Sequence, residues 1–407
     1  LLVHPETPAC SPQMDDKPTI DYLNKLPVEI WREILFAIPS HPILDASEST
    51  NPLTFLDRTQ FRGSGILEVQ KQRLALLKVC KAMVPLAEQL LYSKVSLGGK
   101  ALQDGTFQAA AMTQTVGGSR RRGELTTHIW ICDMCPVLES FDLRVMCPNL
   151  RAFHHCFDYL MVLDLERMIE ESWSLGITTL TLEYSDFGWK DMMNVATCFP
   201  GLNTFKLLDV SEDPGDVTRP ISFPMLHTLT IDAYVGRKFP FTNLRLPSLR
   251  WMSIILVMTD DINYFDNIFK SVSSTLVGFQ IEGVLSDVPL QRIPNDVFGT
   301  LTQLNTYICP LTQHMPDAFL RILPTHPPHD LTNLVFIIPT RAKISYMQQY
   351  AGYFSSKSLF PNLKHVSLAF APLYTHILDD ADLRFLDATK DLFPHAVIDI
   401  VNIVGSH

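Results

Sequence analysis

The stretches FPMLHTLTI at 223–231 and LPSLRWMSI at 246–254 repeat one phrase: an apolar residue, proline, any residue, leucine, and then apolar residues three and five positions after that leucine. Strong copies of the phrase also stand at 147–153, 199–207 and 360–368, weaker copies at 177–182, 275–281, 301–309 and 331–338, and end units at 92–97, 128–131 and 393–400. Alternating apolar side chains are typical of a short strand with one buried face. The proline ends any helix that precedes it.

The leucine anchors recur at intervals of 23 to 30 residues. They are Leu150, Ile177, Leu202, Leu226, Leu249, Leu276, Leu304, Leu334 and Leu363. This period and phrase are typical of leucine-rich repeats, in which stacked copies share one core. Helical patterns occupy gaps between copies, for example Ile262–Val272 and Ile344–Phe354. Residues 93–407 are therefore predicted to form an α/β repeat fold, an irregular solenoid with a parallel β-sheet on its concave face. A doubly wound α/β fold is disfavoured, because no glycine-rich phosphate-binding turn follows any strand.

Composition restricts the function classes. The chain has 407 residues, of which 46% are apolar, with 33 Lys and Arg against 43 Asp and Glu, for a net charge of −10. This balance disfavours a nucleic-acid partner, because there is no cationic surplus to neutralise phosphates. No apolar run approaches the roughly 20 residues that span a bilayer, and the start does not resemble a signal peptide. Eight cysteines without a disulfide framework favour a reducing compartment, the cytosol or nucleus.

The segment DYLNKLPVEIWREILFAIP at 21–39 predicts an apolar helix with Pro27 in its first turn. After a stretch at 39–65 that we interpret as an inserted loop, the pattern LALLKVCKAM predicts a second helix, and Pro85 opens a third that carries Leu86 and Leu90. Residues 1–19, rich in proline, are expected to form a mobile tail.

This order of helices resembles the F-box family, and especially its fungal type. The resemblance covers residues 20–92 and departs from the family pattern in its inserted loop and in Met83, which stands where the family usually has Trp. It implies that the F-box docks on the Skp adaptor of a cullin–RING ubiquitin ligase and that the repeats hold a target protein. The residues expected to contact the adaptor are Leu26, Pro27, Ile30, Ile34, Leu35, Leu74, Leu77, Val79 and Cys80.

The pairing of F-box and repeats implies a substrate-recruiting subunit that performs no chemistry and needs no cofactor. The alternative is a repeat scaffold without a ubiquitylation role. Common catalytic signatures are absent from the sequence. The best metal-ligand set is Cys132, Cys135 and Cys147 with His154, His155 and Cys156. We expect no metal there, because the repeat phrase itself accounts for Cys135–Pro136 and Cys147–Pro148.

The target is expected on the concave face of the sheet. Because strand side chains alternate, the residues two, four and six positions after each anchor leucine point away from the core. This rule selects Thr204, Lys206, Leu208, Thr228, Thr230, Asp232, Trp251, Ser253, Ile255, Gln280 and Glu282. Trp251 is the expected anchor of the target interface. The alternative, in which loops or the N-terminal tail cover this face and bury Trp251, remains open.

Overall fold

The computed structural model describes residues 84–97, 106–131, 143–156, 176–183, 189–210, 220–234, 243–257, 266–284, 300–310, 330–338, 361–370, 384, 387, 389–391 and 393–402. The chain divides into two compact units, Leu1–Ser40 and His41–His407, and every described residue belongs to the second unit.

A parallel sheet of 12 strands forms the second unit, and its strands follow one another in chain order. The strands of this sheet are β1 (Lys94–Leu97), β2 (His128–Ile131), β3 (Ala152–Cys156), β4 (Thr179–Glu183), β5 (Thr204–Val210), β7 (Thr228–Tyr234), β9 (Trp251–Val257), β10 (Gly278–Val284), β11 (Thr306–Pro310), β12 (Asn333–Ile338), β13 (His365–Phe370) and β14 (Val397–Asn402). The helices are α4 (Val84–Ser93), α6 (Thr106–Met112), α7 (Leu143–Met146), α9 (Trp189–Cys198), α10 (Asp266–Val272) and the 3-10 helix η5 (Arg122–Leu125). This arrangement confirms the predicted repeat solenoid with a parallel sheet.

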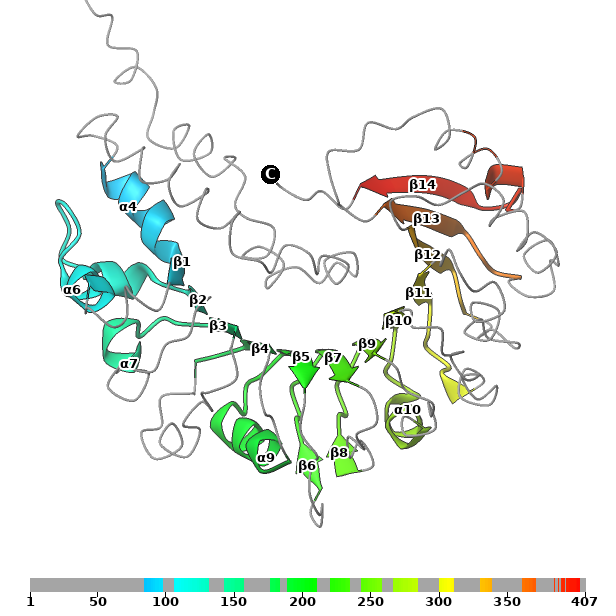
Figure 1. Ribbon diagram of the computed structural model, residues 1–407, viewed down its shortest axis with the longest axis horizontal. Helices are drawn as coiled ribbons and strands as arrows, with labels where there is room; N and C mark the ends of the chain where they lie inside the picture. The colour runs from blue at the N-terminus through cyan, green and yellow to red at the C-terminus, as the bar shows by residue number, and fades with distance from the viewer. Residues whose placement is uncertain are drawn as a thin grey trace, which may run out of the picture. The chain divides into compact units, whose positions relative to one another are not determined.

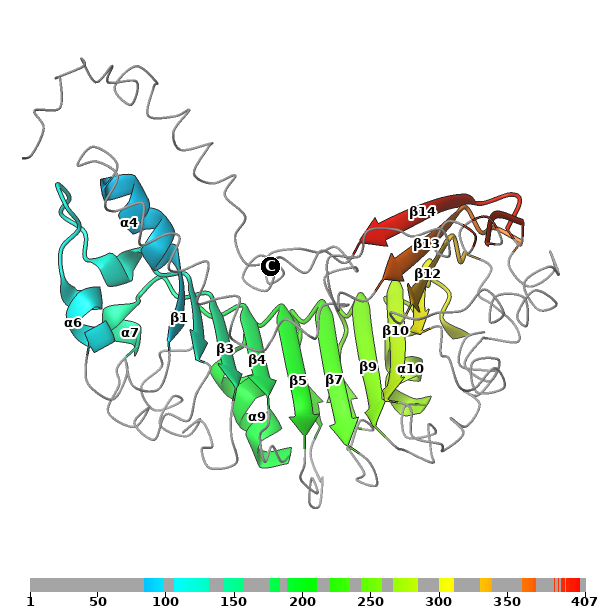
Figure 2. The same cartoon turned by 45° about the horizontal axis from the view of Figure 1, so that its top comes forward.

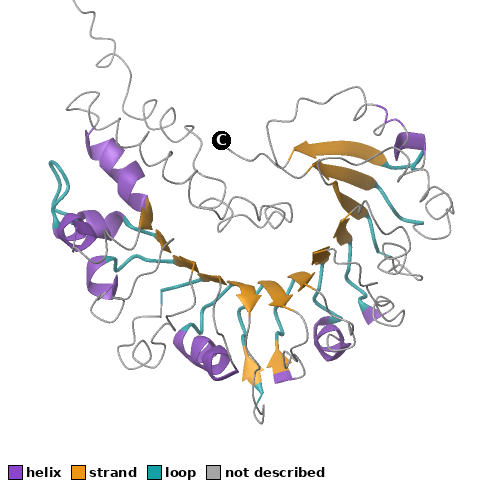
Figure 3. Ribbon diagram, viewed as in Figure 1, coloured by secondary structure: helices purple, strands orange, loops and turns teal. Residues whose placement is uncertain are grey.

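The two faces of the sheet differ. Helices α6, α7, α9 and α10 lie on one face, and the sheet bends toward the other, which is therefore concave (Figures 1 and 3). A second, two-stranded parallel sheet of β6 (Ile221–Ser222) and β8 (Leu244–Arg245) lies on the helical side. Figure 2 shows the long strands side by side from β1 to β14.

One backbone carbonyl in each repeat fixes where the next strand begins. The carbonyl of Asn203, for example, accepts hydrogen bonds from the N–H groups of both His227 and Thr228, at 2.8 and 3.0 Å. The carbonyl acceptors of such paired bonds are Thr127, Arg151, Thr178, Asn203, His227, Arg250, Val277, Asn305 and Thr332. The strands therefore start level with one another, and equivalent residues of successive repeats lie side by side.

A β-turn precedes each of several strands and explains the proline of the repeat phrase. The N–H of Leu202 donates to the carbonyl of Phe199 at 3.0 Å, and the same bond joins Leu226 to Phe223 at 3.3 Å. Proline then occupies the second position of the turn, where its fixed φ is favoured. Both apolar ends of each turn are buried in the core. Proline therefore shapes the entry into the strand as well as ending the element before it.

The predicted alternation of buried residues is confirmed. Leu202, Phe205 and Leu207 are at most 1% exposed, and the equivalent residues of neighbouring repeats are buried beside them in one continuous core. Aromatic rings link the repeats within this core: Phe279 meets Phe269 of α10 edge to face at 5.1 Å and stacks on Tyr307 at 6.0 Å. Sharing a core across repeats stabilises units that are too small to fold alone.

All twelve predicted strands are present, but one anchor was wrong. Leu334 pairs with Tyr307 and Val366, so it lies on the strand, and Leu331 is the residue equivalent to Leu304. The segment LTNLVFII carries two leucines three apart, but only Leu331 has apolar residues both three and five positions after it, because Pro339 stands five after Leu334. The predicted helix at 262–272 is present as α10, with Phe269 and Val272 buried. The helix predicted at 344–354 lies outside the described residues.

The third helix of the F-box-like segment is described. Helix α4 has Pro85 in its first turn, as predicted, and buries Leu86, Ala87, Leu90 and Leu91. It leads directly into β1. The first two predicted helices, the inserted loop at 39–65 and the tail at 1–19 lie outside the described residues, so the proposed domain boundaries stay predictions.

Phe279→Ala is expected to lower the free energy of unfolding by about 3–5 kcal/mol, because it removes a ring that is 1% exposed and packs on two other aromatic rings. Chemical denaturation measures the change. Val397→Ala, at a valine that is 55% exposed, is the matched control and should change little. Equal effects of the two substitutions would contradict the shared core.

Candidate interaction surface

The concave face carries its side chains in rows that cross the strands. Row one consists of Thr179, Thr204, Thr228, Trp251 and Gly278, which pair in register from β4 to β10. Row two consists of His154, Thr181, Lys206, Thr230, Ser253 and Gln280, from β3 to β10. Row three has two parts, Glu183 with Leu208 and Asp232 with Ile255 and Glu282, because the register shifts between β5 and β7 after Leu207; their backbone belongs to the sheet, and their side chains lie outside the described part.

The structure brings the predicted target-binding residues together in these rows. It differs from the prediction in their exposure. Thr204, Thr228 and Trp251 of row one are half-buried, but Lys206, Thr230, Ser253 and Gln280 of row two are 1–8% exposed. Alternation along a strand predicts which face a residue occupies, and it does not predict what covers that face.

Trp251 lies against the backbone of the neighbouring strand. It pairs in register with Gly278, and a Cβ atom added to Gly278 would overlap the six-membered ring of the Trp251 indole. Glycine at 278 therefore leaves the space that the indole occupies. This contact fixes one face of the ring and explains why Trp251 is half-buried.

A stacked pair of rings stands at the N-terminal end of row two. Trp130 of β2 is fully buried, and its indole stacks on the imidazole of His154, with ring centroids 4.7 Å apart and 19° between the planes. The hydroxyl of Thr181, on the next strand, lies 2.9 Å from Nδ1 of His154. Sequence reasoning missed His154 and Trp130 as surface candidates, although the rule that selected Lys206 also selects His154, four residues after Leu150.

Two buried histidines of this face, His154 and His128 of β2, have lowered pKa values and are neutral at physiological pH. Burial, and then the nearby Lys206 and His128, hold the pKa of His154 well below its ordinary value. Burial, and then Lys94 and Arg151, lower the pKa of His128 to about 4. The imidazole of His154 is therefore a neutral hydrogen-bonding group, with one nitrogen able to donate and the other to accept.

An apolar cluster stands at the other end of row two. Ile308 and Val335 continue the row onto β11 and β12 and form a second small core with Ile337 and Ala369, separate from the main one. Along this register the concave face thus passes from a stacked Trp–His pair, through polar side chains, to an apolar pair on β11 and β12, and then to Ser367 and Asp399 on β13 and β14. The sequence contains this change in character, but its extent depends on the strand register.

Two of the candidate metal ligands, His154 and His155, lie on opposite faces of β3. His154 faces the concave side, and His155, its neighbour on the strand, packs into the core beside Phe153. One ion cannot be bound by two side chains on opposite faces of a strand. Cys147 is a buried free thiol whose pKa burial raises to about 11. Cys132 and Cys135 lie outside the described residues, as does the side chain of Cys156. Among the described side chains, no three His, Cys, Asp or Glu lie close enough to hold a metal ion.

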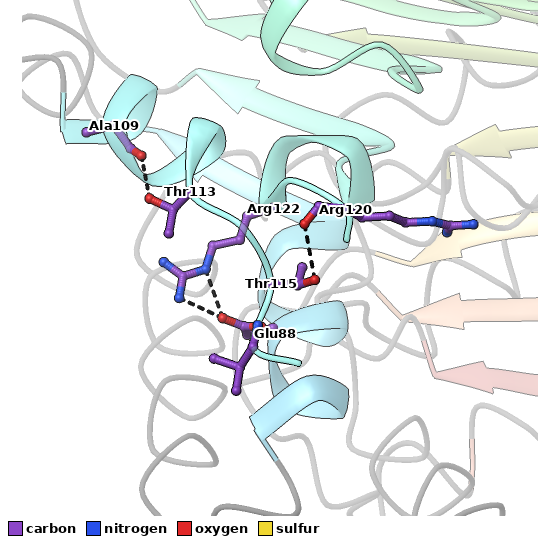
Figure 4. A network of polar contacts seen from close by, with 7 residues as sticks. Glu88, Ala109, Thr113, Thr115, Arg120 and Arg122 are labelled. Carbon is purple, nitrogen blue, oxygen red and sulfur yellow. Dashed lines mark hydrogen bonds and ion pairs between the residues drawn. The ribbon is translucent and has the colours of Figure 1, made fainter. Parts of the chain in front are cut away.

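The basic loop at 117–124 has a structural role at the N-terminal end of the sheet. The guanidinium of Arg122 donates two hydrogen bonds to Oε1 of Glu88 in α4, at 2.8 and 2.6 Å, and the N–H of Val116 donates to Oε2 at 2.8 Å (Figure 4). Glu88 is 1% exposed, and Arg122 also lies over the ring of Tyr92. Hydrogen bonds between charged groups are stronger than those between neutral groups. These contacts of Glu88 fasten α4 to the loop before β2.

The predicted adaptor-binding residues, Leu26 to Cys80, lie outside the described residues. Within the part of the chain that is described, no helix has the length and hydropathy required to cross a bilayer.

Comparisons with known proteins add little to this picture. No family model matches the chain, and no curated protein matches it. Among solved structures, a Bacteroides fragilis protein from a structural genomics programme is 14% identical, with a TM-score of 0.32 over 65% of this chain and 68% of that one.

Gly278→Ala is expected to displace the Trp251 ring, because the added methyl group would occupy its place. In protein labelled with 5-fluorotryptophan, one ¹⁹F resonance should shift, and Trp251→Phe assigns it. Gly201→Ala is the matched control, since nothing lies within 4 Å of its added Cβ. An unchanged Trp251 resonance in Gly278→Ala would contradict the contact.

The buried histidines predict a loss of stability in mild acid. Their pKa values are depressed in the folded chain, so the unfolded chain binds more protons as the pH falls below about 6.5. The free energy of unfolding should decrease by up to about 1.4 kcal/mol per pH unit for each such histidine. His154→Gln should make the pH dependence of the free energy of unfolding between pH 6.5 and 5 shallower by about one proton, and an unchanged slope in this variant would contradict the prediction.

Proposed function

We propose that this chain is the substrate-recruiting F-box subunit of an SCF-type cullin–RING ubiquitin ligase. The N-terminal segment would bind the Skp adaptor, and the concave face would hold a target protein. The chain would act by raising the local concentration of the target near the ubiquitin-loaded enzyme and would perform no chemistry itself. Cytosol or nucleus is the compartment in which it would do so.

The observation that supports target binding is the ordered concave face. Twelve strands in register present a broad surface with a half-buried Trp251 and a row of polar side chains, and solenoids use such surfaces to bind proteins. The F-box assignment is supported by the sequence resemblance at 20–92 and by α4, whose start, proline and buried leucines match the predicted third helix.

A scaffold that binds proteins without ubiquitylation is the second candidate. The same concave surface supports it equally well, and the two candidates differ only in adaptor binding. An adaptor interaction, measured directly, therefore separates them.

The full chain should retain purified Skp adaptor in a pull-down, and Ile34→Asp should abolish this. The reason is that a charge in a desolvated apolar interface costs several kcal/mol. Val397→Asp, at an exposed valine of β14, is the matched control and should leave binding intact. A correctly folded Ile34→Asp chain that binds the adaptor with unchanged affinity would overturn the F-box proposal and leave the scaffold.

A further inference from the structure

Row two contains buried polar atoms that lack hydrogen bonds. Within the described part of the chain, His154 Nε2, Thr230 Oγ1 and Ser253 Oγ have no hydrogen-bond partner, and these residues are 3%, 5% and 1% exposed. A buried polar group without a partner costs about 1–3 kcal/mol. Three such groups on one row call for an explanation.

The fold itself does not require polar side chains at these positions. Two strands further along, the same row holds Ile308 and Val335, which are buried in an apolar cluster. Row two therefore accepts apolar side chains, and in β3 to β10 the chain carries histidine, threonine, serine and glutamine instead. Replacing an unsatisfied buried hydroxyl with an apolar group is neutral or stabilising, so folding stability does not account for them.

We propose that row two binds the main chain of an extended segment of the target protein, lying across the strands. This inference deepens the proposed function, because it rests on the concave face holding the target, and it holds equally for the scaffold. The row crosses five strand spacings, about 24 Å, which is the length of about seven extended residues. Peptide groups supply both donors and acceptors, and this matches hydroxyl groups and a neutral imidazole.

Charge and shape favour a peptide main chain over other ligands. Lys206 is the one cation of row two and the other residues of the row are neutral, so the row lacks the cluster of cations that would favour an anion. A sugar would need a free aromatic face for stacking. Trp130 is fully buried against His154, and one face of Trp251 rests on Gly278. The peptide groups of a target segment that reaches row two would supply hydrogen-bond partners to the buried atoms that now lack them.

The test uses the purified full chain and a phage-displayed library of linear dodecapeptides. A selected peptide is synthesised and its affinity measured by fluorescence anisotropy. The double variant Thr230→Val, Ser253→Ala should bind it about tenfold or more weakly while melting at the same or a higher temperature. Ser271→Ala is the control, since its hydroxyl donates to the Ile268 carbonyl within α10, and it should bind the peptide normally.

Main-chain recognition has its own signature. Methylation of single backbone amides in the middle of the peptide should weaken binding strongly, whereas alanine substitution at the same positions should be tolerated. Four results would overturn the proposal. They are that no peptide is selected, that the double variant binds the peptide normally, that the double variant melts at a clearly lower temperature, or that one side chain rather than the backbone carries the affinity.

A synthetic peptide of residues 1–19 that displaces the selected peptide would instead assign the row to a segment of this chain. Adaptor pull-down with the same variants should be unaffected, so failure here is distinguishable from failure of the F-box assignment.

Discussion

The rest of the structure depends on a pair of hydrogen bonds: the N–H of a strand's first residue and the N–H just before it both donate to one carbonyl of the preceding repeat. This pair recurs from Thr127 to Thr332 with donor–acceptor distances of 2.8–3.1 Å. Because it starts every strand at the same level, equivalent side chains of successive repeats become neighbours in space. Alternation then sends one set of rows into the shared core and the other set onto the concave face. The surface available to a partner is thus a direct consequence of backbone register.

The two faces of the sheet contribute differently to the stability of the fold. On the core face, buried leucine, isoleucine and phenylalanine supply nearly all the cohesion between repeats. The concave face contains residues that contribute little to stability or oppose it. They include two histidines whose pKa values are lowered and a glycine that leaves room for the Trp251 indole. Glycine within a strand costs conformational entropy, and here it is offset by the packing of a large indole. The stability that the shared core supplies along the whole sheet offsets these local losses of stability.

Much of the fold was predictable from the sequence, because each copy of the repeat phrase specifies the local backbone geometry of one turn and one strand. The proline turn, the strand and the alternation lie within nine residues of one another, so each copy carries its own signal. Long-range features lacked such a signal. Glu88 and Arg122 are 34 residues apart and belong to no shared pattern, and the burial of Lys206 and Ser253 depends on what lies over the face. The pair β6 and β8 was missed because two-residue strands leave no periodicity. The Leu334 anchor was wrong although the sequence favours Leu331, because Pro339 stands five positions after Leu334, where the phrase has an apolar residue.

Helix α4 is fastened to the start of the sheet by its chain connection and by side chains. If the F-box assignment holds, α4 is the last helix of the adaptor-binding element and also the element that enters β1. Its buried Glu88 holds Arg122 and the Val116 N–H from the loop before β2, so that helix and the first two strands are joined by backbone and by side chains. A protein that acts by raising the local concentration of its target benefits from such a fixed connection, because a flexible connection would let the target occupy a larger volume. The carboxylate can be this deeply buried because both of its oxygens accept hydrogen bonds, so no charge is left unsatisfied.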